Sequence, residues 1–543
     1  MQQLAVMKII LIYLEALDRS DKYELATLGK YPTRMPLGIL YLAAVLENRK
    51  HKVEIIDNAL YEYKHEILIE MITKEKPDAI GFSTTYKNLA NSKLIAEKIK
   101  KVDSLIKIIF GGPEMSIHPE KTASLPYVDL VVLGEGEEVL VEIFENNLEN
   151  LGTLPNLVFK GSDGEIVFTK VAPPISNLDV LPFPARHLVK IEDYKQKYPQ
   201  LVPLNIIASR GCPYRCSFCS LPKEDKKYRT RDSNRVVDEI ELLVNKYGER
   251  SIAFVEENFA VNKKQVYEIC DEIIRRKIKI SWSCNTRVNN VDLEMLSRMK
   301  EAGADLILFG VESGSQRILD FLKKDITIQQ IKNAFTWCKS VNISTFASFM
   351  IGIPTETKAE IFESFDLMGE IRPDQFSFQT YVGVPGTELY DYVEKNKFYS
   401  EKWENIQIIS TPMIPREEMK KIEKEMNFRC NLYKLFGPLG IKLPKRDLSY
   451  HYLENGFKNI IQEMKAGVFA IERNGEEKRG IEALRGLLAS LDENSLFGQK
   501  VITYLNIIIG YCYKNFIKDD VKAKEYAAKA LVCDKDIILP YKI

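Results

Sequence analysis

Short apolar runs alternate with amphipathic stretches in two separate blocks of this 543-residue chain, and this alternation restricts the fold more than any other feature. In the first block the apolar runs cover residues 7–13, 53–57, 79–83, 107–112 and 129–134. Amphipathic segments such as 37–50 and 91–102 lie between them. This alternation is typical of an α/β fold, in which helices cover both faces of a parallel sheet. We therefore expect a Rossmann-like parallel sheet over residues 1–150.

The alternation resumes at residue 204. The apolar runs of this second block cover residues 204–209, 251–257, 279–284, 306–313, 344–352 and 375–381. Helical patterns separate them, for example at 233–248, 291–303 and 327–341. Strand–helix repeats at this spacing predict a partial (β/α)6 barrel over residues 204–400, whose active site would lie at the carboxyl ends of its strands.

Two segments depart from the alternation. Residues 151–203 are rich in proline and contain the turn sequence GSDGEIV, so we expect a linker with a small hairpin. After residue 400 the strand pattern fades, and amphipathic segments at 416–437, 451–469 and 519–534 predict an all-helical C-terminal domain over 401–543. Several domains are also what a chain of this length is expected to form.

Charge and hydropathy argue against two classes of partner. Lysine plus arginine and aspartate plus glutamate both total 76, so the chain lacks the basic field of a typical nucleic-acid-binding protein. The apolar run at residues 7–13 has no cleavage site after it, and no later run approaches the roughly 18 residues of a membrane span. We expect a cytoplasmic, soluble protein that binds no nucleic acid and has no membrane span.

The nine cysteines are too few and too scattered for a disulfide framework, but three of them are closely spaced. Cys212, Cys216 and Cys219 form a C-x3-C-x2-C pattern on the loop after the first barrel strand. A structural zinc site usually has four ligands, and no fourth cysteine or histidine lies nearby. A 4Fe–4S cluster on three cysteines leaves one iron open to a ligand. The pattern predicts such a cluster, with coincidence or a degenerate zinc knuckle as the alternatives.

Small residues and glycines end the strands of the first block, at 83–85, 111–114 and 134–137. Open α/β sheets bind ligands at the carboxyl ends of their strands, and small residues let a large ligand approach the backbone. No G-x-G-x-x-G sequence follows the first strand, which disfavours a dinucleotide.

The cysteine pattern and the barrel strand ends together resemble the radical S-adenosylmethionine (SAM) superfamily. The segment 256–259 resembles the acidic motif that meets the methionine amino group, and 310–314 resembles the segment that contacts the ribose and carboxylate. The turn at 352–354 matches the apolar turn beside adenine, and Arg287 is the candidate for the methionine carboxylate. The resemblance implies that SAM is bound by Phe218, Glu256, Glu257, Asn258, Arg287, Glu312, Ser313 and Ile353.

The first block resembles the cobalamin-binding domain that precedes the radical domain in one branch of this superfamily. The resemblance rests on segments 36–47, 53–60, 110–114 and 133–137 and, with the barrel, covers about residues 1–400. It implies that cobalamin is bound by Ser83, Thr84, Thr85, Gly111, Gly112, Pro113, Glu114, Gly134, Glu135 and Gly136. The D-x-H-x-x-G motif that ligates cobalt elsewhere is absent, which leaves the lower ligand unassigned. His118 is the histidine nearest a strand end, and a surface loop is the alternative for it.

The resemblance also implies a reaction. The reduced cluster would cleave SAM to a 5′-deoxyadenosyl radical, which takes a hydrogen from an unactivated carbon, and in the methylating branch cobalamin then donates a methyl group. Carbon methylation is the leading prediction. The alternatives are a cobalamin-assisted rearrangement or oxidative cyclisation without methyl transfer, and a non-enzymatic cobalamin or redox sensor. Methylthiotransferases use three N-terminal cysteines for a second cluster, whereas this chain has no cysteine before Cys212.

The expected partners are a small-molecule or peptide substrate and an external electron donor such as flavodoxin or ferredoxin. Tyr381, at the end of the sixth barrel strand, either borders the substrate or caps the core. Arg229 and Arg231 follow the cysteine loop and either meet a carboxylate or phosphate or form a solvated basic turn.

Overall fold

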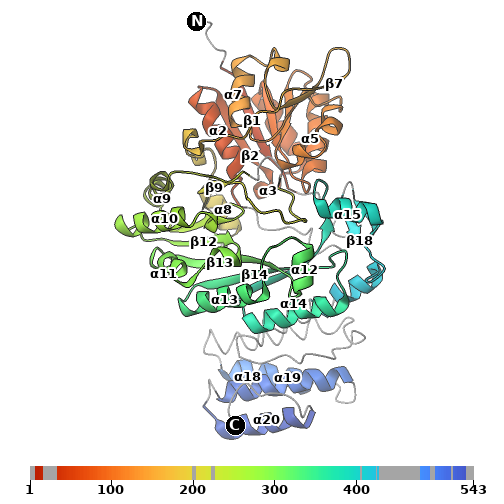
Figure 1. Cartoon of the computed structure of the whole chain (residues 1–543). Coiled ribbons are helices and arrows are strands. Elements are labelled where there is room, and N and C mark those ends of the chain that lie inside the picture. The colour runs from red at the N-terminus through yellow and green to blue at the C-terminus, as the bar shows by residue number, and fades with distance from the viewer. Residues whose placement is uncertain are drawn as a thin grey trace. The chain divides into compact units, whose positions relative to one another are not determined.

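The computed structural model describes residues 6–15, 34–198, 204–221, 227–403, 406–423, 425–426, 477–489, 496–514 and 518–533. The chain divides into two compact units, Met1–Pro354 with Pro373–Ile409 and Thr355–Arg372 with Ser410–Ile543. Both predicted parallel sheets belong to the first unit (Figure 1). The predicted helix at 451–469 and part of the one at 416–437 lie outside the described residues.

A parallel sheet forms in the first block, as predicted. Its parallel strands are β1 (Lys8–Tyr13), β2 (Lys52–Asp57), β3 (Ala79–Ser83), β4 (Lys107–Gly111) and β5 (Leu130–Val132), in the order β2-β1-β3-β4-β5. Its helices are α2 (Leu37–Asn48), α3 (Asn58–Tyr61), α4 (His65–Glu75), α5 (Leu89–Val102), α6 (Pro119–Ala123) and α7 (Glu137–Glu145). Each predicted apolar run forms one of these strands.

Strand β1 shows why these runs are continuously apolar. Ile10 and Ile12 belong to a core cluster that contains residues of α4 and α5, whereas Ile9 and Leu11 belong to a second cluster with residues of α2 and α7. Successive side chains of a strand point to opposite faces, and here both faces are covered by helices. Two apolar layers therefore hold the sheet, and the loops at its strand ends are left for ligands.

The predicted hairpin at 157–168 is part of this sheet. Strand β6 (Leu157–Lys160) pairs antiparallel with β5, and β7 (Ile166–Phe168) pairs antiparallel with β6. Helix α8 (Ile191–Lys197) follows, and its Tyr194 hydroxyl donates to Asp57 Oδ2 at 2.6 Å. The segment between the two blocks is thus tied to the first sheet. The domain limits at 150, 203 and 400 stay predictions.

The second sheet has six strands, and each neighbouring pair is parallel. They are β8 (Leu204–Ile206), β11 (Ser251–Phe254), β12 (Ser281–Thr286), β13 (Ala304–Glu312), β14 (Ser344–Ile351) and β15 (Gln375–Thr380), ordered sequentially. Five of the intervening helices belong to the first unit: α9 (Ser233–Tyr247), α10 (Lys263–Arg275), α11 (Leu293–Glu301), α12 (Gln316–Phe321) and α13 (Ile328–Ser340). The helix between β14 and β15 belongs to the second unit. Sequential parallel order is what the repeats predicted, while curvature into a barrel stays a prediction.

Local sequence fixes where the helices of this sheet begin. The side chains of Asp232, Asn262, Asp292 and Thr327 each accept a hydrogen bond from a backbone N–H three residues later. These are N-caps, which satisfy a donor that the first turn of a helix leaves free. Short 3-10 turns complete the first unit at η2 (Pro113–Ser116), η3 (Leu151–Thr153), η4 (Leu178–Val180), η5 (Arg186–Leu188), η7 (Phe259–Val261) and η8 (Val288–Asn290).

The all-helical prediction from residue 401 is wrong at its start. Strands β16 (Val382–Gly383), β17 (Tyr399–Trp403) and β18 (Ile406–Ile409) form an antiparallel sheet, and α15 (Glu388–Asn396) lies between the first two in sequence. Strand β17 contains Glu401 and Lys402, and β18 has only four residues, so neither forms a clear apolar run. The second unit contains α14 (Lys358–Ile371), α18 (Glu477–Ala489), α19 (Leu496–Cys512) and α20 (Asp520–Cys533). In the described part of the chain no helix has the length and apolar character needed to cross a membrane.

Candidate functional site

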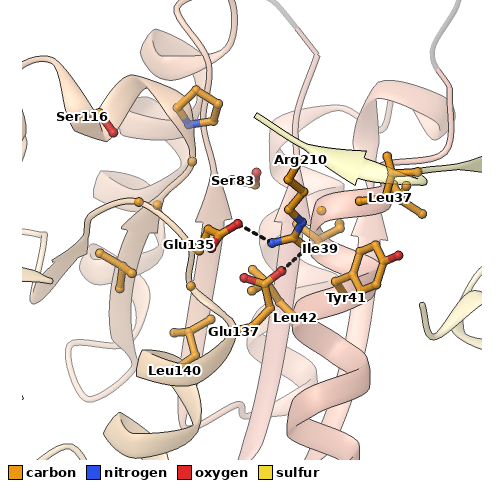
Figure 2. A pocket seen from close by; sticks show the side chains of 18 of the residues that line it. Leu37, Ile39, Tyr41, Leu42, Ser83, Ser116, Glu135, Glu137, Leu140 and Arg210 are labelled. Atoms are coloured by element: carbon orange, nitrogen blue, oxygen red, sulfur yellow. Dashed lines mark hydrogen bonds and ion pairs between the residues drawn. The ribbon is translucent and has the colours of Figure 1, made fainter. Parts of the chain in front are cut away.

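A cavity of about 400 Å³ lies where strand ends of the two parallel sheets meet within the first unit (Figure 2). Its lining from the first sheet includes Ser83, Gly111, Gly112, Pro113, Gly134, Glu135 and Gly136. Its lining from the second sheet includes Ile207, Ser209, Arg210, Gly211, Val255, Glu256 and Glu257. The structure thus brings most of the predicted cobalamin residues to the same cavity as two of the predicted SAM residues.

Three predicted cobalamin residues are outside this lining, namely Thr84, Thr85 and Glu114. The Thr84 hydroxyl donates to the Gly111 carbonyl at 2.7 Å, and the Glu114 N–H donates to the Thr84 carbonyl at 3.3 Å. The Thr85 N–H donates to Asn88 Oδ1 at 2.7 Å. The first two contacts join the loops after β3 and β4, and the third lies within the loop after β3.

Glycines give the cavity wall its depth. A Cβ atom added at Gly38 or Gly134 would meet no atom within 4 Å, although both residues line the cavity. At Gly112 the backbone has φ +95° and ψ 176°, a conformation essentially restricted to glycine, and a Cβ there would lie 2.6 Å from the Thr84 carbonyl oxygen. Exposed backbone and open space at these positions fit a large cofactor that packs against the loops.

His118 does not provide a metal ligand in this cavity. Its side chain is exposed, and its Nδ1 lies 3.5 Å from Glu120 Oε1. Among the described residues no histidine lines the cavity. The position of His118 agrees with the surface-loop alternative, and the lower cobalt ligand stays unassigned.

The cysteine loop is held at several points. Cys212 and Cys216 are partly buried and Cys219 is exposed. At the start of the loop, β9 (Ser209–Arg210) pairs antiparallel with β10 (Arg229–Thr230). In the middle, the Ser217 N–H donates to the Leu322 carbonyl at 2.9 Å.

The three thiols are the donor set that the sequence assigns to a cluster. Among the described residues no three histidine, cysteine or acidic side chains converge as a single-ion site would require. A cubane differs, because each cysteine binds its own iron and the sulfurs need not meet at one point. Three thiols on one short loop fit a cubane, in which one iron stays open to a further ligand.

Arg287 connects the cysteine loop with the end of β12. Its Nη1 donates to Cys216 Sγ at 3.2 Å, and its guanidinium carbon lies 3.8 Å from the centre of the Tyr214 ring. The Tyr214 hydroxyl donates to Asn290 Oδ1 at 3.0 Å. Arg287 Nη2 is buried and has no hydrogen-bond partner. A buried N–H that lacks an acceptor fits an incoming carboxylate, as predicted for the methionine group.

Glu256 supplies a complementary group at the end of the neighbouring strand, β11. Its Oε1 accepts from the Ala208 N–H at 3.1 Å, and its Oε2 is buried without a partner. Burial raises the pKa of this carboxyl to about 8. A cationic amine beside Oε2 would stabilise the ionised form. Glu257 is exposed at the same cavity.

Asn258, also predicted to bind SAM, is buried in a polar network. Its Nδ2 donates to Asn290 Oδ1 at 3.2 Å, and its Oδ1 accepts from the Thr286 hydroxyl at 2.9 Å. Because Tyr214 donates to the same Asn290 oxygen, this network links the cysteine loop with the ends of β11 and β12.

Glu312 lies at a strained position. Its φ is +67°, which is uncommon for a residue with a side chain and costs roughly 1–3 kcal/mol. Its Oε1 lies 2.7 Å from Lys324 Nζ, and both side chains are buried. Lys324 Nζ is 5.8 Å from the Phe218 ring centre. The carboxylate predicted to contact SAM is therefore already paired with a lysine.

The remaining predicted residues gather in one apolar cluster. Ile353 and Tyr381 are buried in it, and Phe218 packs against it. The Tyr381 N–H donates to the Ile351 carbonyl at 2.8 Å. A flat apolar wall of this kind suits an adenine ring. Ser313 is fully buried and its Oγ accepts from the Ser315 N–H at 3.1 Å, so its hydroxyl shapes the turn after β13.

The two basic residues after the cysteine loop meet carboxylates of the chain itself. Arg229 Nη1 lies 2.8 Å from Glu135 Oε2, and Arg231 Nη1 lies 2.7 Å from Glu239 Oε2. Both arginines are buried, so neither forms a solvated turn. Sequence reasoning missed Arg210, which pairs with Glu135 across the cavity wall. These two residues are 75 positions apart, and no local pattern links them.

Two family models match the chain. The radical SAM superfamily matches residues 206–368, and the B12 binding domain matches residues 31–144. A protein of Pyrococcus horikoshii named as an uncharacterised methyltransferase is 32% identical over 415 residues, which make up 75% of this chain and 88% of the relative. The anaerobic magnesium-protoporphyrin IX monomethyl ester cyclase of Cereibacter sphaeroides is 31% identical over 382 residues, 67% of this chain and 60% of the cyclase.

Two solved structures share the fold over most of the chain. OxsB, a cobalamin-dependent S-adenosylmethionine radical enzyme solved with aqua-cobalamin, matches with a TM-score of 0.66 at 17% identity, covering 98% of this chain and 85% of OxsB. TsrM from Kitasatospora setae, a radical S-adenosylmethionine methyltransferase solved with cobalamin and a [4Fe-4S] cluster, matches with a TM-score of 0.64 at 15% identity, covering 89% of this chain and all of TsrM. The likeness shows a common α/β architecture.

Proposed function

The chain belongs to the radical SAM superfamily, in the branch that carries a cobalamin-binding domain, and from this premise we propose that it methylates an unactivated carbon of its substrate. The predicted family is confirmed, and with it the cofactor set of a 4Fe–4S cluster, SAM and cobalamin. When bound, these groups supply a carbon-centred radical and a methyl group. The remaining task of the protein is to bind, orient and shield them.

The observation that carries the proposal is the shared cavity. Glycine-lined loops of the B12-binding domain and the end of β11 in the radical SAM domain line the same space of about 400 Å³. A methyl donor and a radical generator that face one substrate need this arrangement, because the reacting groups must come within contact distance. A cavity that excludes water also protects a reactive radical.

The residues that would hold each group follow from the site geometry. Cys212, Cys216 and Cys219 would ligate the cluster, and the loops at 111–113 and 134–136 would hold cobalamin. Arg287 Nη2 and Glu256 Oε2 are free to accept the carboxylate and amine of SAM. The cluster of Phe218, Ile353 and Tyr381 would contact its adenine. An external reductant such as ferredoxin or flavodoxin would deliver the electron.

Methyl transfer is favoured over the alternatives by the relatives. The Pyrococcus relative and the cytidylyl-2-hydroxyethylphosphonate methyltransferase of Streptomyces wedmorensis, 25% identical over 413 residues, are both named as methyltransferases. The cyclase relative supports the second candidate, oxidative cyclisation without methyl transfer. Because the relatives are named as enzymes, they argue against a non-enzymatic sensor.

Isotope labelling separates the two reactions. The reduced holoenzyme would be incubated with SAM carrying a labelled methyl group and with small-molecule and peptide fractions of a cell extract. We expect the label in a new product, with 5′-deoxyadenosine formed in parallel. A product that forms without label, with labelled carbon only in methionine, would show cyclisation or rearrangement instead.

A further inference from the structure

Arg210 lies at a junction between the two cofactor-binding loops. It precedes Cys212 by two residues and belongs to β9 of the radical SAM domain. Its Nη1 donates to Glu135 Oε1 at 2.9 Å, and its Nη2 donates to Glu137 Oε1 at 2.5 Å (Figure 2). Both acceptors follow β5 of the B12-binding domain, and all three residues line the cavity. One side chain thus links the start of the cysteine loop to the predicted cobalamin loop.

Further contacts fix the same junction. Arg229 is the partner of Arg210 in the β9–β10 pair, and its Nη1 donates to Glu135 Oε2 at 2.8 Å. The Ile175 N–H donates to the same oxygen at 2.7 Å. The guanidinium of Arg210 also lies 5.2 Å from the ring centre of Tyr41 on α2. Both oxygens of Glu135 are therefore occupied by groups of the chain.

The charges balance and are shielded from water. The side chains of Arg210, Glu135, Glu137 and Arg229 retain 17%, 11%, 6% and 4% of their exposure. Two arginines face two carboxylates, so the junction carries no net charge. Ion pairs in such surroundings are weakly screened, and the two-pronged guanidinium adds a directional constraint that an ammonium cannot supply.

We propose that Arg210 is a positioning residue, which sets the separation of the cluster and cobalamin by fixing the cysteine loop against Glu135 and Glu137. The inference rests on the proposed cofactor sites and is independent of whether the reaction is methylation or cyclisation. Cys212 is two residues from Arg210, while Glu135 is flanked by the cavity glycines Gly134 and Gly136. A shift of either loop would therefore move one cofactor site relative to the other.

The expected consequence is uncoupling of the two halves of the reaction. Reductive cleavage of SAM would require SAM, the cluster and one electron from the external reductant but not cobalamin, whereas methyl transfer would also require cobalamin at the correct distance. A misplacement of about 1 Å can slow such a step about 100-fold. Loss of the Arg210 contacts should therefore leave 5′-deoxyadenosine formation largely intact and lower the ratio of final product to 5′-deoxyadenosine by about tenfold or more.

The test compares Arg210→Met with a matched control, Arg298→Met. Arg298 also pairs with two carboxylates, Asp271 and Glu301 at 2.6 Å each, but on an exposed face away from the cavity lining. The readout is the magnetic interaction between cob(II)alamin and the reduced cluster in the holoenzyme, measured by electron paramagnetic resonance. We expect the wild-type splitting to broaden or shift in Arg210→Met and to stay unchanged in Arg298→Met.

Two further variants keep the test decisive if Arg210→Met loses its cofactors. Glu137→Gln retains the shape of the side chain and removes one charge of the junction, and it should alter the splitting in the same direction. The charge-exchanged double variant, Arg210→Glu with Glu137→Arg, should restore part of the wild-type splitting. A wild-type splitting and product ratio in both Arg210→Met and Glu137→Gln, at full cofactor content, would refute the positioning role. Failure of the proposed function is distinct, because it would show in the wild type as an unlabelled product.

Discussion

At the residue scale, several buried polar atoms of the site lack partners, and two of them are charged groups, Glu256 Oε2 and Arg287 Nη2. Buried polar groups are nearly always hydrogen-bonded, so such atoms point to a missing ligand. They lie after β11 and β12, which are neighbours in the second sheet. A ligand with one amine and one carboxylate satisfies both, as the methionine part of SAM does. We therefore propose that these two atoms recognise the methionine part of SAM.

Replacing any one of Cys212, Cys216 and Cys219 by alanine should abolish the visible absorption of the reconstituted cluster and lower 5′-deoxyadenosine formation to background. Three thiolates are the full ligand set of this cluster, so none is dispensable. Absorption spectra and product analysis by mass spectrometry would measure both effects. Cys270→Ala is the matched control, because Cys270 is a buried core residue of α10, and it should keep both signals. Persistent 5′-deoxyadenosine in all three variants would contradict the assignment.

Glu256→Gln should change how the stability of the ligand-free protein depends on pH. The folded-state pKa of Glu256 is about 8, above its usual value of 4.5, so the folded protein holds a proton there that the unfolded chain releases. Glu256 should therefore lower the stability of the wild type as pH rises from about 5 to 8, by up to about 1.4 kcal/mol per pH unit, and the glutamine variant should lack this contribution. Urea unfolding at several pH values measures it. Glu257→Gln, at an exposed neighbour, should retain most of the decline, and parallel curves for wild type and Glu256→Gln would refute the prediction.

The cysteine triad leads to a prediction by a local pattern alone, because three thiols within eight residues indicate a metal site without knowledge of the fold. The role of Glu135 could not be predicted from the sequence. Its position in a glycine-rich loop suggested contact with cobalamin, whereas its carboxylate binds Arg210 and Arg229. Sequence reveals which residues end a strand, but the partner of a side chain depends on which other loop the fold places opposite.

At the element scale, the loops that end the strands of the first sheet depend on backbone shapes that side chains would block. The loop after β4 crosses directly over Thr84, and only a glycine at position 112 allows this approach. The loop after β5 begins at Gly134, whose φ is +64°. The apolar strands between the helices provide stability, and these glycines provide the concave wall. The apolar pattern of the strands thus predicts the sheet, and the glycines of the loops predict the shape of the cavity wall.

Gly112→Ala should destabilise the first sheet by roughly 2 kcal/mol or more, because the backbone conformation suits glycine alone and the new Cβ would lie 2.6 Å from the Thr84 oxygen. The affinity for cobalamin should fall together with the stability of the sheet. Urea unfolding and equilibrium binding of cobalamin would measure these effects. The control is Gly152→Ala, where a Cβ meets nothing within 4 Å, and it should change neither quantity appreciably. Equal stability of both variants would show that the loop adapts.

The strands and helices of both blocks were predictable because each strand lies in an apolar run of five or more residues. Such continuous runs arise because both faces of the sheet are buried. Strands β17 and β18 were missed, because Ile406–Ile409 is too short to distinguish a strand from a helical turn. The hairpin at 157–168 was expected, but its attachment to β5 is a long-range pairing that the sequence does not encode locally.

At the scale of the whole molecule, the two parallel sheets form one compact unit joined by buried polar contacts. Asn205 Nδ2 donates to the Met35 carbonyl at 2.8 Å, in addition to the Arg210 and Arg229 ion pairs. When one partner of a buried ion pair is removed, the free energy of unfolding typically falls by about 3–5 kcal/mol. The B12-binding and radical SAM domains are therefore distinct in sequence pattern and interdependent in stability.

Removing residues 1–150 should yield aggregated or poorly folded protein, because it leaves Arg210 and Arg229 without their carboxylate partner and exposes the edge of β6. Soluble yield and circular dichroism would measure the outcome. The same truncation with Arg210→Met and Arg229→Met is the matched comparison and should recover part of the yield, since the uncompensated charges are gone. A soluble truncated protein that binds a full cluster would show that the radical SAM domain folds alone.

The Arg210 contacts also set a rule for building hybrids of this protein with its relatives. A donor sequence that replaces the B12-binding domain must present carboxylates where Glu135 and Glu137 stand, or two buried guanidinium groups lose their acceptors. Transplanting segments 133–137 and 207–231 as a matched set would preserve the junction. A hybrid built in this way should keep the spacing of the two cofactor sites, provided that the proposed SAM residues and the Asn205–Met35 contact are retained as well.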